Sequence, residues 1–484
     1  MSHPALVIAP VIIPLSTAML TAWAYRRPAL QTAISLAGVL AFLLAAIGLL
    51  QSVDAQGHLA MQFGNWEKPF GIAFLIDRTG ASLVLITALM GTASLVFLLS
   101  DADPGSRHPL TLPLVHGVLA GVSGSFCTAD LFNLYVWFEV MLICSLGLFA
   151  IGRRIDQLDG TFKYMALNLV GTLLLLMSVG MIYAATGHLY FGALSEAYAT
   201  LPPGLALALL TALTLAFLMK AGAFPLFAWL PAAYHTLPAP VLALFAGLLT
   251  KVGVYTVLRT LGDVFTPAPG LLMEALGWIA VATMVTGVLG AAYHWDIRRI
   301  LAFHIVSQIG YILLGIALNT EAGFTATLFY TLHHIVVKAN LFLIGAIVWF
   351  WTGSYDLRRV GGLYAARPLL AVLFLIPALS LVGIPPLSGF WAKFLVLQEA
   401  IAQGRVAWTV AALLVSVLTL YSMMKIWMEA FWKPHPEGAL APVQGRIWPA
   451  YLATTSLAGI TLWIGLAPQH LLAFAQAAAR SFNL

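Results

Sequence analysis

Charged side chains are scarce in this sequence. Lys, Arg, Asp and Glu make up 8% of its 484 residues, whereas soluble globular domains carry about 25%. Hydrophobic residues make up 61%, and the mean hydropathy is +0.95. This composition excludes an ordinary soluble protein. Because helices satisfy all their backbone hydrogen bonds within one segment of lipid-embedded chain, the long apolar runs predict an all-α polytopic membrane protein.

Cysteines and cofactor motifs are also scarce. The two cysteines, Cys127 and Cys144, are too few for a disulfide framework, an iron–sulfur cluster or a zinc site. No Walker sequence or dinucleotide fingerprint occurs, so we expect no cofactor and no bound metal. The net charge of +5 is spread over short loops without a basic stripe, which argues against a nucleic-acid partner. We expect a transporter subunit and not an enzyme, energised by an ion gradient or by partner subunits.

Apolar runs long enough to cross a bilayer recur along the whole chain. At roughly 20 residues per span they predict about 14 transmembrane helices and no soluble domain. We expect three of the runs to be broken helices, and the polar connection near 51–74 to be too short to fold alone. The runs are 4–24, 29–50, 76–100, 110–128, 131–151, 163–186, 203–234 (broken), 239–261, 270–292, 298–318, 322–352 (broken), 368–402 (broken), 406–431 and 447–468.

Loop lysines and arginines fall into two unequal sets. The smaller set is Lys68, Arg78, Arg259, Arg405 and Arg480. The larger set is Arg26, Arg27, Arg107, Arg153, Arg154, Lys163, Arg298, Arg299, Arg358, Arg359, Arg367, Lys433 and Arg446. Because cytoplasmic loops carry the excess of basic residues, the larger set predicts the cytoplasmic side. An even number of spans then places both termini outside the cell inner (plasma) membrane.

The stretch 218–253 places two lysines, Lys220 and Lys251, in apolar segments. Between them lie four prolines, Pro225, Pro231, Pro238 and Pro240. Charged groups in hydrocarbon are costly and usually functional. A broken helix at membrane depth is tolerated where its backbone is buried in protein or lines a water-filled cavity. We therefore expect a buried, hydrated path for protons or cations, with Lys220 exchanging between an acidic partner and the cavity and Lys251 as the next relay.

A second broken run repeats this arrangement at 368–402. It reads A-L-S-L-V-G-I-P-P-L-S-G-F-W-A-K-F up to the residue after Lys393, and the next span also carries a lysine, Lys425. Each broken run comes fourth in a block of five spans, spans 4–8 and spans 9–13. Five is an odd number, so the blocks have opposite orientations, which predicts inverted repeats with an ion path near the midplane. The expected divisions are 1–109 for the first three spans, 110–261 and 262–433 for the repeats, and 434–484 for the last span and tail.

Glu139 is the one acidic residue deep within a span. It stands in L-F-N-L-Y-V-W-F-E-V-M-L-I-C-S-L-G-L. A charge at the centre of a helix costs roughly 2.5–3.5 kcal/mol on insertion scales, and a partner lysine would offset that cost. A functional carboxylate and a structural ion pair between two helices both fit this position.

Three further basic residues extend the possible path. His334 and Lys338 are one helical turn apart, so they share a face and can pass a proton along it. The adjacent His333 diverges by about 100° and no acidic or cysteine partner is near, so a metal site is not expected. Lys393 follows a pair of prolines by about two turns and is expected in the outer half of the membrane, at the exit end of the relay.

Other polar residues have less definite roles. Lys425 and Glu429 are four residues apart near the end of a span, where a structural pair and a relay fit equally well. His235 follows the first broken run and either opens the path to the cytoplasm or has no part in it. His304 and Gln308 share a helix face and either line a polar path or are satisfied core residues.

Three stretches resemble a known family. They read D-L-F-N-L-Y-V-W-F-E-V-M-L, L-M-K-A-G-A-F-P-L-F-A-W-L-P-A-A-Y-H-T-L-P-A-P-V and L-T-K-V-G-V-Y. They resemble the antiporter-like proton-translocating family, which includes large membrane-arm subunits of respiratory complex I, membrane-bound hydrogenases, and the A and D subunits of Mrp sodium/proton antiporters. The resemblance covers nearly the whole chain. The wording around Glu139 and the chain length are most similar to the D type.

The resemblance implies a fold of two inverted five-helix repeats with broken helices 7 and 12. It implies that Glu139 pairs with the helix-7 lysine, Lys220, and that Lys251 is the helix-8 lysine. It also implies that His334 or Lys338 is the central residue of helix 11, and that Lys393 is the terminal residue of helix 12. Some family members have glutamate at that last position. The long lateral C-terminal helix of the largest members is missing here, which argues against the distal complex I subunit.

These features together predict a proton-translocating subunit of a Mrp-type cation (Na⁺)/proton antiporter, with A-type and small membrane subunits as partners in the lipid bilayer. The nearest alternative is a proton-pumping subunit of a complex I-like or hydrogenase assembly, which would co-purify with iron–sulfur proteins. A second is a membrane partner for inorganic-carbon uptake, which would bring a large zinc-containing soluble partner. A third is a structural scaffold, whose buried lysines could be replaced by leucine without loss of transport.

Overall fold

The fold is almost entirely helical. The computed structural model describes residues 3–64, 71–101, 103, 105–152, 154–436, 438 and 446–482. The helices are α1 (His3–Trp23), α2 (Pro28–Gln56), α3 (Arg78–Leu98), α4 (Thr111–Cys127), α5 (Leu131–Ala150), α6 (Ile155–Thr186), α7 (Phe191–Tyr198), α8 (Pro203–Ala221), α9 (Trp229–Ala233), α10 (Ala239–Arg259), α11 (Gly270–Tyr293), α12 (Ile297–Ala317), α13 (Glu321–Thr352), α14 (Leu363–Ala366), α15 (Pro368–Val382), α16 (Ser388–Ala402), α17 (Val406–Ile426), α18 (Trp448–Leu466) and α19 (Pro468–Ala479). Short 3₁₀ turns (η1, Tyr234–Thr236; η3, Leu357–Arg359) and π-helical turns (η2, Thr260–Val264; η4, Trp427–Trp432) join or extend them.

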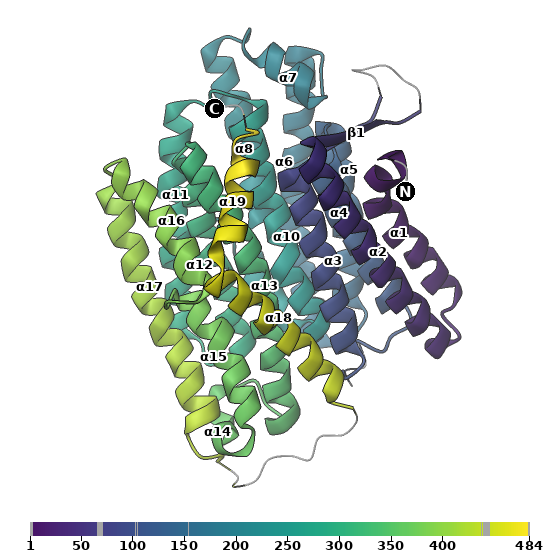
Figure 1. Ribbon diagram of the computed structural model, residues 1–484, viewed down its shortest axis with the longest axis vertical. Helices are drawn as coiled ribbons and strands as arrows, with labels where there is room; N and C mark the ends of the chain where they lie inside the picture. The colour runs from purple at the N-terminus through teal and green to yellow at the C-terminus, as the bar shows by residue number, and fades with distance from the viewer. Residues whose placement is uncertain are drawn as a thin grey trace.

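Within the described residues, 12 helices are long and apolar enough to cross a membrane, and α4 and α15 are shorter apolar helices. Each of the apolar runs in the sequence overlaps one of these helices. Figure 1 shows most of them running side by side along the long axis of the molecule. In the same view α1 begins and α19 ends at the end of the bundle that carries β1 and α7, opposite α14.

The all-α prediction is confirmed, and one short hairpin adds to it: after α2 the chain forms antiparallel strands β1 (His58–Gln62) and β2 (Ala73–Asp77). Three other features differ from the expectations. The span expected at 322–352 is one unbroken helix, α13, because no proline interrupts it. α6 begins eight residues earlier than expected, and the C-terminal tail contains α19. Lys68 and Arg153 lie outside the described residues.

Both broken spans end their first half at a glycine. The residue that caps α8 is Gly222 (φ +75°), and the residue that caps α15 is Gly383 (φ +97°). In each case the residue after the glycine donates its backbone N–H to a carbonyl five residues back, from Ala223 to Leu218 and from Ile384 to Leu379. This is a left-handed helix cap that glycine adopts without steric cost. The glycines therefore end the helices, and the prolines that follow prevent the helices from resuming at once.

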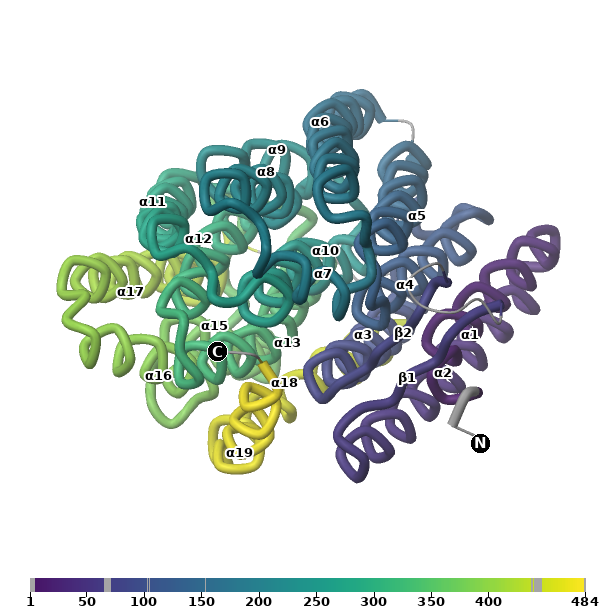
Figure 2. The backbone as a smooth tube through the Cα atoms, turned by 90° about the horizontal axis from the view of Figure 1, so that it is seen from above, coloured from purple at the N-terminus to yellow at the C-terminus, as the bar shows by residue number. Residues whose placement is uncertain are grey.

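Three helices form the centre of the bundle. Every residue of α10 is buried, as are nearly all residues of α12 and most of α13. Figure 2, seen from above, shows α10 and α13 between the edge formed by α16 and α17 and the edge formed by α1 and α2. Polar groups on these central helices are therefore shielded from lipid by the surrounding helices.

Basic residues of the larger loop set gather at one end of the bundle, where α11 ends and α12 begins. We call this the arginine-rich end. There Arg154 bonds the carbonyl of Thr236, Arg299 bonds His235, and Arg298 lies over the ring of Tyr355 at 3.9 Å. The N-cap residue Asp296 also forms a β-bridge with Asp356. The loops that the charge bias groups together are thus neighbours in space.

Candidate functional site: a line of buried lysines

Glu139 and Lys220 are joined through a third residue and are not in direct contact. The hydroxyl of Thr172 lies 2.9 Å from Glu139 Oε1 and 2.7 Å from Lys220 Nζ. A carboxylate can only accept and an ammonium can only donate, so this hydroxyl donates to Glu139 and accepts from Lys220. The ion pair implied by the family resemblance is therefore replaced by a bridged one, because Thr172 of α6 stands between α5 and α8.

Lys220 is held at the end of the first broken helix. Its ammonium also donates to the carbonyl of Asn168 at 3.1 Å, and its side chain is 5% exposed. The carbonyl of Met219, at the end of the lysine's own helix, accepts from the indole of Trp229 at 3.1 Å and not from Lys220. The lysine therefore draws its partners from α6 and not from its own broken helix.

The turn that carries Lys220 packs directly against the helix that carries Lys251. A Cβ added to Gly253 would lie 2.5 Å from the backbone nitrogen of Ala221. Only a glycine permits this approach of α10 to α8. The close contact fixes how far Lys251, half a turn earlier on α10, lies from the end of α8.

The central residues are fully buried. Lys251 Nζ donates to the carbonyl of Ala246 at 2.7 Å. On α13, Lys338 Nζ and both ring nitrogens of His334 are buried and have no hydrogen-bond partner among the described residues. A Cβ added to Gly247, one turn before Lys251 on α10, would lie 3.8 Å from the Cβ of Ala339, the residue after Lys338 on α13, so these lysines lie on helices in direct contact. Charging both of them together in a low-dielectric interior is costly, which favours one proton at a time.

Lys393 closes the line in the second broken span. Its ammonium donates to the carbonyl of Val382 at 2.8 Å and to the hydroxyl of Ser416 at 3.0 Å. It also lies 4.8 Å from the centre of the Tyr311 ring, and the Tyr311 hydroxyl is 2.8 Å from the same Ser416 oxygen. Unlike Lys220, Lys393 therefore takes a carbonyl at the end of the first half of its own broken span.

His333 reaches the same break from α13. Its Nδ1 lies 2.8 Å from the hydroxyl of Ser388, which lies 2.9 Å from that of Ser380. Ser380 also accepts from the backbone N–H of Gly389. This histidine therefore ties the two halves of the broken span to the central helix.

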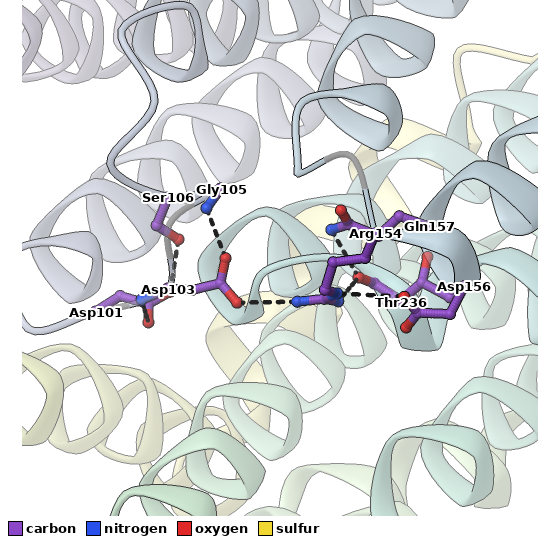
Figure 3. A network of polar contacts seen from close by, with 8 residues as sticks. All are labelled: Asp101, Asp103, Gly105, Ser106, Arg154, Asp156, Gln157 and Thr236. Carbon is purple, nitrogen blue, oxygen red and sulfur yellow. Dashed lines mark hydrogen bonds and ion pairs between the residues drawn. The ribbon is translucent and has the colours of Figure 1, made fainter.

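The break of the first span is anchored at the arginine-rich end. Figure 3 shows Arg154 donating to the Asp103 carboxylate at 3.3 Å and to the carbonyl of Thr236 at 2.8 Å. Gln157 donates to the same carbonyl at 3.1 Å. Since Thr236 precedes α10, the network fixes the end of the break against α6 and against the connection between α3 and α4.

His235 faces two open cavities at this end, of about 430 and 460 Å³, which also share His294 and Arg299. Its Nε2 is 3.1 Å from the Arg299 guanidinium, which can only donate, so Nδ1 carries the proton and donates to the carbonyl of Pro231 at 3.0 Å. Burial and the charges of Arg299 and Arg298 lower the pKa of His235 to about 4. The histidine is therefore neutral at neutral pH.

Of the two alternatives for Lys425 and Glu429, the structural pair does not form. Lys425 donates to the carbonyls of Ala292 and His294 at 2.7 and 2.6 Å, which caps the end of α11. Glu429 accepts from Lys433 at 2.8 Å. Free carbonyls at the end of a neighbouring helix compete for the lysine, and they cannot be seen in a local sequence pattern.

Three residues of this site did not stand out in the sequence: Thr172, Ser416 and Gly253. Two of them are hydroxyl residues in apolar spans, where the usual partner is a carbonyl of the same helix. A weak signal exists for Thr172, because Asn168 lies one turn before it on α6. Gly253 follows Lys251 by two residues, and small residues mark close helix contacts in membranes.

Comparison with known proteins agrees with this architecture. Residues 128–419 match the family described as NADH:quinone oxidoreductase/Mrp antiporter, transmembrane. The chain is 38% identical to the D subunit of the Na(+)/H(+) antiporter of Alkalihalophilus pseudofirmus, over 96% of this chain and 94% of that one. It is 35% identical to the corresponding D subunit of Bacillus subtilis, over 95% and 94%. A chain of the Mrp complex from a Dietzia species superposes with a TM-score of 0.90 at 32% identity, over 99% of this chain and 97% of that one. The chain therefore belongs to the NADH:quinone oxidoreductase/Mrp antiporter transmembrane family.

Proposed function

We propose that this chain is the proton-carrying D-type subunit of a multisubunit Mrp antiporter that exchanges Na⁺ for protons. The observation that carries the proposal is the line of four buried lysines on the central and broken helices, with a carboxylate bridged to the first. Scaffolding alone does not account for several buried cations, since each costs free energy in the membrane. The antiporter names of the relatives, which align over nearly their whole length, favour cation exchange.

In this proposal protons move among Glu139, Lys220, Lys251, Lys338 and Lys393, with His334 beside Lys338. Thr172 couples the charge of Glu139 to that of Lys220, because its hydroxyl bonds both. When Glu139 loses its charge, the Thr172 hydroxyl no longer has to donate to it and becomes free to turn. The hold on the neighbouring ammonium then weakens, and its proton can move on to the central helices.

We further propose that the path lies across two inverted repeats, residues 110–261 and 262–433. The two breaks support this, because each has the same glycine cap and the same i to i−5 backbone bond. The next span after each break also carries a lysine, Lys251 and Lys425, whose ammonium donates to backbone carbonyls. The arginine-rich end faces the cytoplasm in this proposal, in accordance with the basic excess there, so both termini lie outside the plasma membrane.

The decisive experiment measures Na⁺-driven proton movement in everted vesicles that carry the complete complex. Lys220→Ala and Glu139→Ala should each lower the rate at least tenfold with normal assembly, because each removes one end of the bridged pair. Lys433→Ala is the matched control, since it removes an ammonium from a half-exposed surface pair. If Lys220→Ala and Glu139→Ala retain wild-type antiport in assembled complexes, the proposed path is wrong.

The family description also covers redox-driven complexes. A pump subunit of such a complex would use the same buried line but would be driven by electron transfer in a partner. Purification of the complex from its native membrane separates the two functions. Small membrane subunits alone support the antiporter, and stoichiometric iron–sulfur proteins support the pump.

A further inference from the structure

His304 is a buried histidine that lies outside this line. It stands on α12, seven residues from the start of that helix at the arginine-rich end, and it is fully buried. Its Nε2 lies 2.6 Å from the hydroxyl of Ser422 on α17. Its Nδ1 is buried without a hydrogen-bond partner among the described residues. A buried nitrogen with no partner costs free energy, so the position calls for an explanation beyond packing.

The hydrogen bonds assign the proton on this ring. The Ser422 hydroxyl also lies 3.0 Å from the carbonyl of Thr419, and a carbonyl can only accept. The hydroxyl therefore donates to Thr419 and accepts from His304 Nε2–H. In the neutral ring this leaves Nδ1 as a lone pair that is ready to take a proton.

Polar groups connect His304 to the central lysines. Gln308 lies one turn further along α12, and its Oε1 accepts from the hydroxyl of Tyr330 at 2.6 Å. The Tyr330 ring packs near that of His334 on α13, with centres 6.5 Å apart. The amide nitrogen of Gln308 and the hydroxyl of Ser307 are also buried without partners among the described residues. These groups line one continuous side of α12 toward the centre.

The other side of His304 leads to the arginine-rich end. Lys425 lies three residues beyond Ser422 on α17, so the two side chains share a face. Its ammonium holds the carbonyl of His294 at 2.6 Å. The imidazole of His294 lines both open cavities, and it stacks on Phe303, the residue before His304, at 5.0 Å. Solvent in these cavities is therefore close to Lys425, the last of the polar groups that lead from His304 to this end.

We infer that His304 is a branch of the proton path that connects the central His334–Lys338 pair to solvent at the arginine-rich end, through Ser422 and Lys425. This inference rests on the proposed function and gives the second half of the chain a connection to the two cavities that His235 also faces. In each transfer His304 Nδ1 gains a proton from the core and Nε2 loses its proton to the Ser422 oxygen. Ser422 turns away from Thr419 and passes its own hydroxyl proton to water at Lys425. The neutral ring then carries its proton on Nδ1, and a turn of the ring restores the starting state.

A purely structural role for His304 predicts a different pattern of mutant effects. His304→Gln keeps a side-chain N–H that can donate to Ser422, but it cannot take up a proton. Ser422→Ala removes the hydrogen bond but leaves the imidazole. A structural tie between α12 and α17 is therefore harmed more by Ser422→Ala, whereas a proton branch is harmed at least as much by His304→Gln.

The test uses complete complexes in everted vesicles, with the rate of Na⁺-driven proton movement measured against Na⁺ concentration. We expect His304→Gln to lower the maximal rate at least fivefold and to leave the half-saturating Na⁺ concentration within twofold of wild type. The matched control is His116→Gln, which replaces another buried histidine whose Nε2 lies 2.8 Å from a serine, Ser35, on a neighbouring helix. We expect that control to remain within twofold of the wild-type rate.

The branch is refuted if His304→Gln in assembled complexes runs at the wild-type rate, or if Ser422→Ala lowers the rate and His304→Gln does not. Lys220→Ala in the same series separates this failure from that of the proposed function. If only Lys220→Ala is impaired, the branch alone is wrong, and if neither is impaired, both are wrong. Should His304→Gln fail to assemble, Lys425→Gln decides the matter, with a fivefold loss supporting the branch and a wild-type rate overturning it.

Discussion

Thr172→Val tests the bridged pair with little change in shape. Valine keeps the branched side chain but replaces the hydroxyl by a methyl group, so α6 can pack as before. The substitution removes the bond to Glu139 at 2.9 Å and the bond from Lys220 at 2.7 Å. The lysine retains one acceptor, the carbonyl of Asn168. The substitution changes no other hydrogen bond of the site.

The expected size of the effect follows from the bonds lost. Hydrogen bonds to charged groups contribute about 1.5–3 kcal/mol each, and about 1.4 kcal/mol changes an equilibrium tenfold. Loss of one bond to the ammonium therefore disfavours the charged form of Lys220 roughly 10- to 150-fold. If the resting proton on this lysine is part of the cycle, Na⁺-driven proton movement in everted vesicles should fall at least tenfold.

Two control variants make the outcome specific. Thr172→Ser restores the hydroxyl and should remain within about threefold of wild type, since both bonds can re-form. Thr161→Val removes a hydroxyl from the same helix, but one that bonds only the carbonyl of Gln157 in its own helix at 2.6 Å, and it should have no effect. A wild-type rate for Thr172→Val in fully assembled complexes would refute the role of the bridge, whatever the result for Lys220→Ala.

Three further predictions concern packing, the second break and pH. Gly253→Ala should destabilise the complex by about 1–3 kcal/mol through overpacking, which lowers its melting temperature and its antiport rate. In the control Gly180→Ala, the added methyl group meets no atom within 4 Å, so neither quantity should change. Ser416→Ala should lower antiport about tenfold by removing one of two acceptors from a buried ammonium, and Ser456→Ala, an exposed serine bonded only within its own helix, should not. Because the pKa of His235 is lowered to about 4, protons bind the unfolded chain first as the pH falls below about 6.5, so stability decreases from there toward pH 4. Thermal melts of His235→Gln should show a smaller loss over that range, and an identical loss would contradict the burial of this ring.

The sequence predicted the spans well because hydrocarbon imposes a strong and local constraint. Twenty apolar residues without charges have few alternatives to a membrane helix, and lysines within such runs stand out. Breaks were harder to assign. The two runs with a glycine before prolines are broken, whereas α13 has glycine and no proline and continues through 32 residues. Apolar length alone is therefore no indication of a break.

The sequence did not predict which side chains form hydrogen bonds between neighbouring helices. Whether Thr172 faces its own helix or a neighbouring lysine depends on the rotation of α6 against α5 and α8, which no local pattern records. The same applies to Lys425, whose acceptors are carbonyls at the end of α11. The expectation that Glu139 pairs with Lys220 missed the Thr172 hydroxyl between them, because charge alone suggests an ion pair whereas a bridging group depends on how the helices are rotated.

The support given to each buried lysine decreases toward the centre of the proposed path. Lys220 and Lys393 each have one hydroxyl and one backbone carbonyl as acceptors. Lys251 has one carbonyl, and Lys338 has no acceptor among the described residues. Because a buried ammonium is stabilised by the acceptors around it, a proton rests at lower free energy at the two ends than at Lys338. In the proposed path we therefore assign proton storage to the two end lysines and the transfer step between them to Lys338. Lys338→Gln should accordingly slow transfer and leave the melting temperature of the complex unchanged, whereas replacement of either end lysine by glutamine should slow transfer and also lower the melting temperature of the assembled complex.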